Sequence, residues 1–322
     1  MKEKLLHILL NSETEFVSGE QISKDLGCSR TAVWKHIEEL RKNGYEVEAV
    51  QRKGYRLISR PNMIFAHEIK VGLTTKRIGQ SITYEASIPT TQELAHRFAR
   101  EDAPEGHVVI ADEQTAGKGR MGRVWQSPDG TSVSMSIILR PKIAPQHAPQ
   151  LTLLAAVSVV LAIKKVTGLQ LEIKWPNDIL YKGKKIVGIL TEMQSEPDCI
   201  HSVIIGIGMN VNEKVEQFPE EIRDVATSLA IAIGQEVNRA KVVRAVFEEL
   251  ERLYDQYLLE GFTPIKQLWE QFAISLGKRI TARTLQGTLH GIAKGITDAG
   301  VLIIEDDNGI VHSIYSADIE IN

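Results

Sequence analysis

The chain has 322 residues, of which 43% are hydrophobic and 25% are charged, and its formal net charge is −3. This length suits two or three domains, and the composition is that of a folded globular protein and not the one typical of a disordered chain. Because 38 basic and 41 acidic residues nearly cancel, the total charge identifies no class of partner, and any basic surface has to be found locally.

Three features bear on the compartment. Cys28 and Cys199 are isolated and no Cys/His cluster accompanies them, so we expect neither a disulfide framework nor a structural zinc site. The N-terminal MKEKLLHILL lacks the apolar core and cleavage site of a secretory signal. The most apolar run, 151–163, is shorter than the roughly 20 residues of a membrane span. These features predict a cytoplasmic protein with no membrane partner.

Residues 1–62 are predicted to form a winged helix-turn-helix domain. Ser18 and Gln21 have the spacing of a capping box, in which the serine caps the helix and the glutamine reaches back to it. Gly27 is expected to end that helix and Ser29 to cap the next one. Two helices joined by a tight turn follow from this pattern.

A two-stranded wing follows the second helix. The segment 45–50 alternates, 51–54 can turn and 55–58 returns, before Ser59-Arg-Pro-Asn62 breaks the pattern at a domain boundary. Residues 30–60 carry eight bases against four acids, where a DNA-binding domain needs phosphate contacts. The alternative is a small domain that contacts proteins. The candidate DNA contacts are Ser29, Arg30, Thr31, Lys35, Arg41, Lys42, Arg52 and Lys53.

Residues 63–270 alternate short apolar strands with helices, which predicts a mixed α/β domain around a central β-sheet. Residues 271–322 change to short strands separated by the hairpin-turn signals 298–300 and 307–309. They predict a third domain, a small β-barrel of the SH3-like kind or a sandwich. The clearest elements expected in the central domain are strands at 107–111, 132–139 and 202–206 and helices at 151–166 and 239–259.

The loop QTAGKGRMGRVW holds Gly117, Gly119 and Gly122 at the spacing of a dinucleotide-binding fingerprint. That fingerprint requires a helix directly after the glycines, and Pro128 and Gly130 stand where the helix should run. A P-loop also fails, because the lysine is followed by glycine rather than by serine or threonine. The loop is therefore either a solvated surface loop or a flexible anion-binding lid, with Lys118, Arg120 and Arg123 as its cations.

A second cluster of polar residues lies at 174–178, KWPND, and at 182–190, KGKKIVGIL. A tight turn at 182–183 would join two strands and bring the lysines to the tip of a hairpin. Taken alone, this pattern favours an ordinary hairpin with a lysine-rich tip over a binding site.

With GKGRMGRVW, KWPNDIL, GKKIVGIL and GIGMNV in this order behind a helix-turn-helix, the chain resembles biotin protein ligases that also repress the biotin operon. The resemblance covers essentially the whole chain. It implies an enzyme that joins biotin to ATP with Mg²⁺, forming biotinyl-5'-AMP, and then transfers biotin to a lysine of the biotin carboxyl carrier protein. It also implies a homodimer that forms on ligand binding, binds a palindromic operator, and uses biotinyl-5'-AMP as corepressor.

The resemblance assigns roles to individual residues. Arg120 would hold the adenylate, Lys185 would bridge the biotin carboxyl group and the α-phosphate, and Asp178 would bind Mg²⁺. Biotin contacts are expected at Pro89, Thr90, Thr91, Gln92, Gln114, Lys118, Gly119, Arg120, Lys185 and Gly188. ATP or adenylate contacts are expected at Arg120, Arg123, Trp125, Lys174, Asn177, Asp178 and Asn210.

Two positions depart from the family, which commonly has arginine at Lys118 and serine at Pro89. Lysine lacks the guanidinium fork and proline offers neither a hydroxyl nor an N–H group, so Thr90 or Thr91 would supply the hydroxyl instead. Two other functions stay open: a non-catalytic ligand-sensing repressor, and a ligase for lipoate or another acyl acid. The combined presence of Arg120, Asp178 and Lys185 argues against the first, and the glycine-rich lid with KWPND favours biotin over lipoate.

Overall fold

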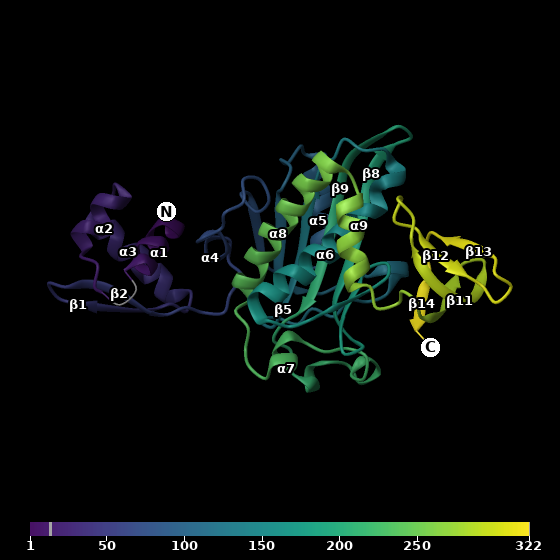
Figure 1. The fold of residues 1–322 in the computed structure, drawn as a ribbon. Coiled ribbons are helices and arrows are strands. Elements are labelled where there is room, and N and C mark those ends of the chain that lie inside the picture. The colour runs from purple at the N-terminus through teal and green to yellow at the C-terminus, as the bar shows by residue number, and fades with distance from the viewer. Residues whose placement is uncertain (13–14, 322) are drawn as a thin grey trace. The chain divides into compact units, whose positions relative to one another are not determined.

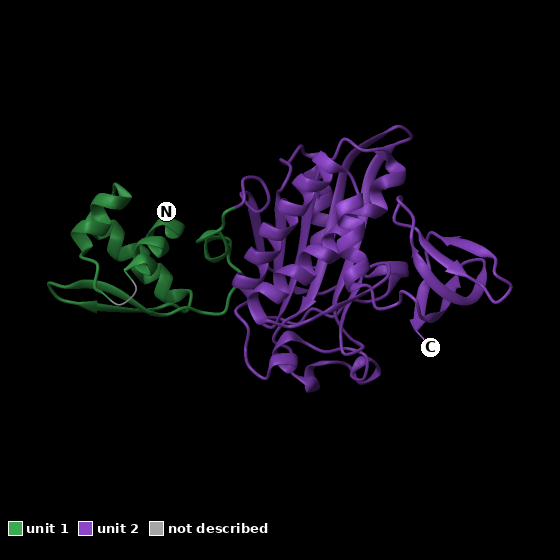
Figure 2. Ribbon diagram, in the orientation of Figure 1, with its two compact units in different colours: residues 1–74 green, residues 75–322 purple. Residues whose placement is uncertain are grey.

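The computed structural model describes residues 1–12 and 15–321, and the chain divides into two compact units, 1–74 and 75–322 (Figure 2). The first unit extends beyond residue 62, where the sequence predicts a domain boundary. The added segment holds α4 (Ala66–Lys70), whose Glu68 carboxylate accepts a hydrogen bond of 2.6 Å from the Tyr45 hydroxyl.

The first unit is a winged helix-turn-helix, as predicted. Ser18 and Ser29 cap their helices by accepting from the backbone N–H groups of Gln21 and Ala32, and Gly27 ends the first of these helices in the left-handed conformation. The capping box is only half formed, because the Gln21 amide donates to Asp25 rather than reaching back. The elements are α1 (Lys2–Asn11), α2 (Gly19–Leu26), α3 (Arg30–Lys42), β1 (Glu46–Val50) and β2 (Gly54–Ser59).

The second unit is built on a seven-stranded sheet in the order β3-β4-β5-β9-β8-β7-β6 (Figure 1). Only the β3–β4 pair is parallel, and the other neighbours pair antiparallel. This confirms the expected mixed α/β domain. The strands are β3 (Ile82–Ile88), β4 (Val108–Gln114), β5 (Ser132–Leu139), β6 (Glu172–Lys174), β7 (Asp178–Tyr181), β8 (Lys184–Glu196) and β9 (Cys199–Asn210).

Helices cover both faces of the sheet. On one face α5 (Thr91–Arg100) packs on β4, β5 and β9 in an apolar cluster that includes Val109, Ile138 and Ile204. Because side chains alternate along a strand, Ser134 and Ser136 of β5 share this face with Ile138. The other layer holds α6 (Ala148–Thr167), which packs against α8 (Arg239–Glu260) and α9 (Thr263–Phe272), and the short α7 (Leu229–Ile233) lies in the connection after β9.

The helical segment Pro145–Thr167 is 23 residues long, longer than the apolar run expected from sequence, and its length and composition would allow it to cross a membrane. However, 67% of its apolar window is buried inside the fold, where α6 contacts α8, α9 and β8. This burial is that of a core helix.

The last part of the chain is β-rich, as predicted, and forms a five-stranded antiparallel sheet in the order β13-β12-β11-β10-β14. Its predicted turns hold Gly300 and Gly309 at positive φ. The final strand was not expected from sequence. The strands are β10 (Arg279–Thr284), β11 (Gly287–Ile296), β12 (Leu302–Glu305), β13 (Val311–Ile314) and β14 (Asp318–Ile321).

A buried ion pair ties α8 to the sheet. The Arg239 guanidinium donates to the Asp112 carboxylate at 2.6 Å and to the Ser132 carbonyl at 2.9 Å, and the Tyr84 hydroxyl donates to the second Asp112 oxygen at 2.5 Å. The Arg239 and Asp112 side chains are 0% and 2% exposed. Four elements, β3, β4, β5 and α8, therefore meet at one charged group.

Replacing Arg239 by alanine should destabilise the second unit by about 3–5 kcal/mol, because it leaves the Asp112 carboxylate buried without its cation. Urea denaturation followed by circular dichroism measures the change. Arg252→Ala on the same helix is the matched control, since Arg252 pairs with Glu249 near the surface and its loss should hardly move the midpoint. Equal shifts for both variants would contradict the role of burial.

Candidate functional site

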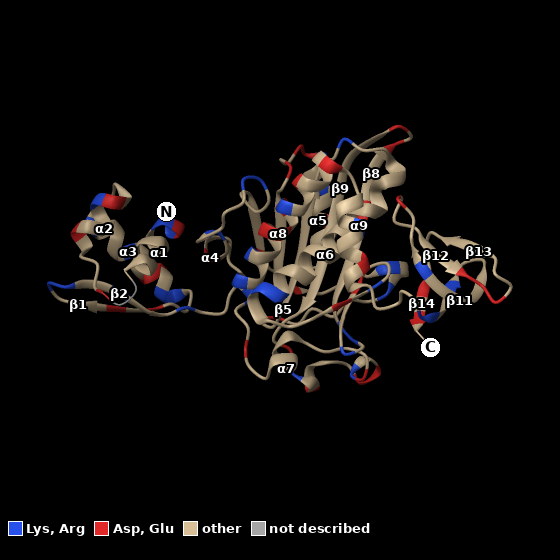
Figure 3. Cartoon of the chain, viewed as in Figure 1, with Lys and Arg blue, Asp and Glu red and all other residues tan. Residues whose placement is uncertain are grey.

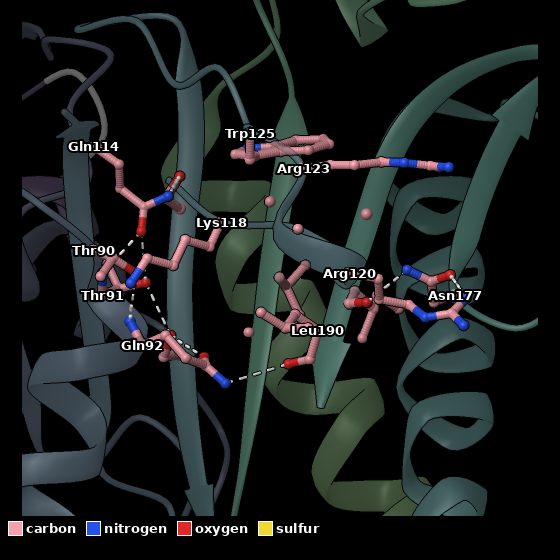
Figure 4. Close-up of a pocket in the computed structure, with 18 of the residues that line it drawn as sticks. Thr90, Thr91, Gln92, Gln114, Lys118, Arg120, Arg123, Trp125, Asn177 and Leu190 are labelled. Carbon is pink, nitrogen blue, oxygen red and sulfur yellow. Dashed lines mark hydrogen bonds between the residues drawn. The ribbon is translucent and has the colours of Figure 1, made fainter. Parts of the chain in front are cut away.

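A pocket opens on the α5 face of the sheet, beside the start of α5. Its walls come from α5, the end of β4, the glycine-rich loop, β5, β7, β8, β9 and the start of β14. Figure 4 shows Gln114 with Thr90, Thr91 and Gln92 on one side, and Arg120 reaching Asn177 on the other. Of the residues predicted for biotin or ATP, the pocket is lined by Thr90, Thr91, Gln92, Gln114, Lys118, Gly119, Arg120, Arg123, Trp125, Asn177, Asp178, Lys185 and Gly188.

Three predicted residues do not line this pocket. Pro89 precedes the lining residue Thr90, and its carbonyl accepts from Ala116 at 2.9 Å. Lys174 lines an adjoining hollow that shares Arg120, Arg123 and Asp178 with the pocket. Asn210 is buried, and its amide donates to the Thr227 carbonyl at 3.1 Å.

The glycine-rich loop folds back on itself instead of opening a helix. Gly119 N–H donates to the Arg123 carbonyl at 2.7 Å, Trp125 N–H donates to the Gly117 carbonyl at 2.9 Å, and one 3₁₀ turn spans Arg120–Gly122. A Cβ atom at Gly117 would lie 2.5 Å from the Trp125 carbonyl oxygen. Glycine is thus required here by close backbone approach, and the rejection of a dinucleotide-binding helix is confirmed by the loop's conformation.

Arg120 is held at the pocket by two neutral oxygens. Its guanidinium donates to Asn177 Oδ1 at 3.1 Å and to the Ser316 hydroxyl, which follows β13, at 2.8 Å. The Asn177 amide in turn donates to the Ile189 carbonyl at 2.9 Å, which fixes its oxygen toward Arg120. Burial lowers the pKa of Arg120 below its ordinary value, but an arginine remains charged. A neutral hydrogen-bonding shell leaves that charge available to an anion.

Lys185 stands at the hairpin tip, where Lys182 and Gly183 both take positive φ in the turn. Its Nζ lies 2.7 Å from Asp178 Oδ1 and 5.5 Å from the centre of the Trp125 ring. Its backbone is fixed as well, since the Lys185 N–H group donates to the Val225 carbonyl at 2.7 Å. The ion pair, the aromatic contact and the backbone hydrogen bond together fix the position of Lys185.

Trp125 lies over a floor made of glycine. Gly188 of β8 and Gly208 of β9 are paired residues in the sheet. A Cβ atom at Gly208 would lie 2.4 Å from the indole, and one at Gly188 would lie 3.0 Å from it. The indole Nε1 is buried and has no hydrogen-bond partner within residues 1–12 and 15–321. It is a donor that a ligand could use.

A polar wall lies opposite the Trp125 ring. Gln114 Oε1 accepts from the Thr91 N–H group at 2.8 Å, and its amide donates to Ser134 Oγ at 3.2 Å. Ser136 Oγ donates to Gln92 Oε1 at 2.9 Å. Together with the apolar Met135, Ile189, Leu190 and Ile207, these groups make a slot with a few fixed polar atoms, as small-molecule sites usually have.

Sequence reasoning missed several pocket residues. The available signals are the alternating serines of β5 and the two glycines of GIGMNV, but neither pattern by itself identifies a pocket residue. Asp318 of β14 gave no signal, although it pairs with Arg123 of the lid. Lys118 is paired with Glu93 at 2.6 Å. The missed lining residues are Val124, Ser134, Met135, Ser136, Ile189, Leu190, Gly206, Ile207, Gly208 and Asp318.

The predicted DNA contacts all lie on α3, its cap or the wing. Arg30 pairs with Glu20 at 2.5 Å, and Arg41 donates to the Val47 carbonyl and to Glu38, which ties α3 to β1. Figure 3 shows basic residues at the turn of the β1–β2 hairpin, where Arg52 and Lys53 lie. All eight predicted contacts are exposed: Ser29, Arg30, Thr31, Lys35, Arg41, Lys42, Arg52 and Lys53.

Comparison with known families gives three matches along the chain. An HTH domain matches residues 2–56, the Biotin/lipoate A/B protein ligase family matches residues 84–210, and the Biotin protein ligase C terminal domain matches residues 275–321. The three matches follow the order winged helix-turn-helix, sheet with pocket, β-rich region.

Individual proteins match over most of their length. The chain is 55% identical over 321 residues to the bifunctional ligase/repressor BirA of Bacillus spizizenii, covering 100% of this chain and 98% of the relative. It is 30% identical over 309 residues to BirA of Escherichia coli, covering 96% and 93%. The solved biotin protein ligase from Aquifex aeolicus in complex with biotin and ATP matches with a TM-score of 0.65 at 28% identity, covering 76% of this chain and 99% of that one.

The glycine floor can be tested by filling it. Gly208→Ala should cost about 1–3 kcal/mol of stability and displace Trp125, because overpacking a filled site forces side chains to move. Thermal unfolding and tryptophan fluorescence measure the two effects. In the Trp125→Ala background the same substitution should cost much less, so an equal cost in both backgrounds would show that the indole contact is not the cause.

Proposed function

The chain belongs to the family of bifunctional biotin protein ligases and repressors, and we propose that its pocket binds biotin and ATP, forms biotinyl-5'-AMP, and serves biotin transfer to a carrier-protein lysine. As a member of this family the chain is an ATP-dependent biotin ligase that carries a DNA-binding domain. The structural observation that supports the proposed pocket best is the convergence of Arg120 and Lys185, from a lid and a hairpin far apart in sequence, on one pocket.

The chemistry explains why two cations are needed. In the first step a biotin carboxylate oxygen attacks the α-phosphate of ATP, a P–O bond forms, and pyrophosphate leaves. Two anionic groups have to meet, so the protein has to neutralise charge before the bond forms. Lys185 would lie between the carboxylate and the phosphate, and Arg120 would hold the phosphate of the adenylate.

Biotin needs a slot with few polar atoms, and the polar wall supplies one. The cyclic urea of biotin would form hydrogen bonds with the side chains of Gln114, Gln92 and the two threonines after Pro89. Leu190 and Ile207 would pack against its aliphatic tail. Lys118 would contribute through its backbone, since its side chain is paired with Glu93. The buried Trp125 N–H group would then face the adenylate.

We assign Mg²⁺ to the Asp178 carboxylate, one of the two carboxylates that line the pocket. Asp178 is only partly buried and shares the pocket with the proposed phosphate-binding cations. Magnesium is commonly held by one or two carboxylates together with substrate phosphates, and bound there it would neutralise phosphate charge. Asp178 also lies 2.7 Å from the Lys185 ammonium, which would hold that charge beside the reacting groups.

The lid has a second role after adenylate formation. The mixed anhydride hydrolyses if water reaches it, and a loop closed over the ligand prevents this. The carrier lysine would then attack the biotinyl carbonyl, forming an amide and releasing AMP. Arg120 and Trp125, both from the loop, would retain the intermediate until the carrier binds.

We further propose that the first unit makes the enzyme a repressor. One helix-turn-helix reads a half-site, so a homodimer is needed for a palindromic operator. The adenylate-bound form would dimerise through the central sheet, with biotinyl-5'-AMP as corepressor, and unmodified biotin carboxyl carrier protein would compete for the same surface. A repressor of this kind would act on chromosomal DNA, so we propose that the protein works in the cytoplasm.

Substitutions of Lys185 and Arg120 should have different effects on the reaction. Lys185→Ala should lower biotin-dependent exchange of pyrophosphate into ATP by about 10²–10³-fold, the usual effect of removing one preorganised charge. The Arg120→Gly variant should instead release the adenylate into solution. The free adenylate should then biotinylate lysines of unrelated proteins. Exchange kinetics and labelling of serum albumin measure the two effects.

Lys184→Ala is the matched control, because this neighbouring lysine is exposed and does not line the pocket. Exchange lowered equally by Lys184→Ala would remove Lys185 from the mechanism. Exchange supported by lipoate as well as by biotin would refute the proposed substrate.

Operator binding should depend on both ligand and salt. With biotin and ATP the protein should bind operator DNA more tightly than without them, because only the ligand-bound form dimerises. The logarithm of affinity should fall linearly with the logarithm of salt concentration, with a slope of about −0.9 for each phosphate contacted. Fluorescence anisotropy over a KCl series provides the test, and equal affinities with and without ligand would refute the coupling.

A further inference from the structure

The outward face of α3 carries one large aromatic side chain. The inward face buries Val33, Ile37 and Leu40 in the core of the first unit. Trp34 points the other way and is 53% exposed, whereas Trp175 and Trp269 of the second unit are 3% and 0% exposed. Trp34 is therefore much more exposed to water than these two tryptophans.

The residues around Trp34 are those expected to face DNA. Positions three and four residues apart lie together on a helix, so Arg30 and Thr31 share its side of α3, and Lys35 is the next residue. All three are exposed. Trp34 thus lies within the predicted DNA-binding surface, in the first two turns of the second helix of the motif, the part that contacts base edges.

The charged neighbours are less free than their number suggests. Arg30 is paired with Glu20 at 2.5 Å. Arg41 is used in joining α3 to β1 through the Val47 carbonyl. Lys35 is a flexible point charge, which suits contact with a phosphate. These partners and geometries suit the cations to positioning α3 on the phosphate backbone.

We propose that Trp34 reads the DNA sequence, by packing its indole against the C5 methyl group of a thymine in the major groove of each half-site. This inference rests on the proposed operator-binding function. Thymine is the base that presents an apolar group in that groove, and apolar side chains recognise it there. The basic residues flanking Trp34, with Arg52 and Lys53 on the wing, match a polyanion and position the helix without specifying bases.

The experiment uses the full-length protein with biotin and ATP, and duplex DNA selected by the wild-type protein from a randomised 40-base-pair pool. Affinity is measured for a selected duplex and for a shuffled duplex of equal composition, over a KCl series. Trp34→Ala should weaken binding to the selected duplex by about tenfold or more, as expected for a lost base contact. Its affinity for the shuffled duplex and its salt slope should stay those of the wild type.

Lys35→Ala is the matched control on the adjacent exposed position. It should weaken binding to both duplexes and reduce the salt slope, as loss of a phosphate contact does. Biotin-dependent pyrophosphate exchange should be unchanged in both variants, because the pocket lies in the second unit.

Replacing single thymines of the selected duplex by deoxyuridine removes only the methyl group. At one position in each half-site this should weaken wild-type binding but leave Trp34→Ala binding unchanged. Wild-type indifference to every deoxyuridine would overturn the proposal, and this arm needs no variant to fold. Equal losses by Trp34→Ala on both duplexes, or loss of its dimer in sedimentation without DNA, would also overturn it.

The two levels of proposal fail separately. If no DNA is enriched from the pool, operator binding itself is refuted and the role of Trp34 falls with it. If DNA is enriched but the Trp34 arm fails, repression stands and only the thymine contact is refuted.

Discussion

The pocket depends on one close approach, that of the Trp125 indole to the backbone of β8 and β9. Because Gly188 and Gly208 are paired across these strands and carry no side chains, the ring can lie directly on the sheet. Trp125 ends the glycine-rich loop, so the contact also fixes where the loop returns. Asn177, which belongs to the KWPNDIL motif, donates to β8 next to this floor and accepts from Arg120. A single backbone contact thus assembles segments far apart in the sequence.

Charge is arranged around this floor so that cations are held but not fully neutralised. Arg120 has neutral oxygens as partners, whereas Lys185 and Arg123 face the carboxylates of Asp178 and Asp318. A charged ligand can therefore replace a carboxylate in contact with a cation that is already positioned. Preorganised charge of this kind costs little reorganisation when the reacting groups arrive. The glycine-rich loop already has defined contacts in this conformation, through Arg120 and Arg123.

Local signals predicted the helix-turn-helix well, because caps, turn glycines and periodicity act within a few residues. Ser18, Gly27 and Ser29 perform their expected tasks, and only the reach of Gln21 differs, since Asp25 one turn away offers its amide a better partner. What sequence could not reveal are contacts between distant segments. Asp318 meets Arg123 across 195 positions of the chain, and the serines of β5 acquire a role only when α5 places Gln92 beside them. The identity of the substrate came from family resemblance, because no periodicity encodes a cyclic urea.

The basic residues of the two units differ in their exposure to solvent, and this changes how they would bind anionic ligands. In the pocket Arg120 and Lys185 are partly buried and held by defined partners, so salt screens them less than it screens exposed charges. On α3 and the wing the bases are exposed, so their attraction for DNA is strong at low salt, falls as counterions compete, and distinguishes no sequence. A chain with a net charge of −3 can hold both surfaces only by separating them along its length, as the basic stretch at 30–60 does. Ionic strength then controls occupancy of DNA with little effect on adenylate formation, and base selection is left to a side chain whose contact is apolar and therefore insensitive to salt.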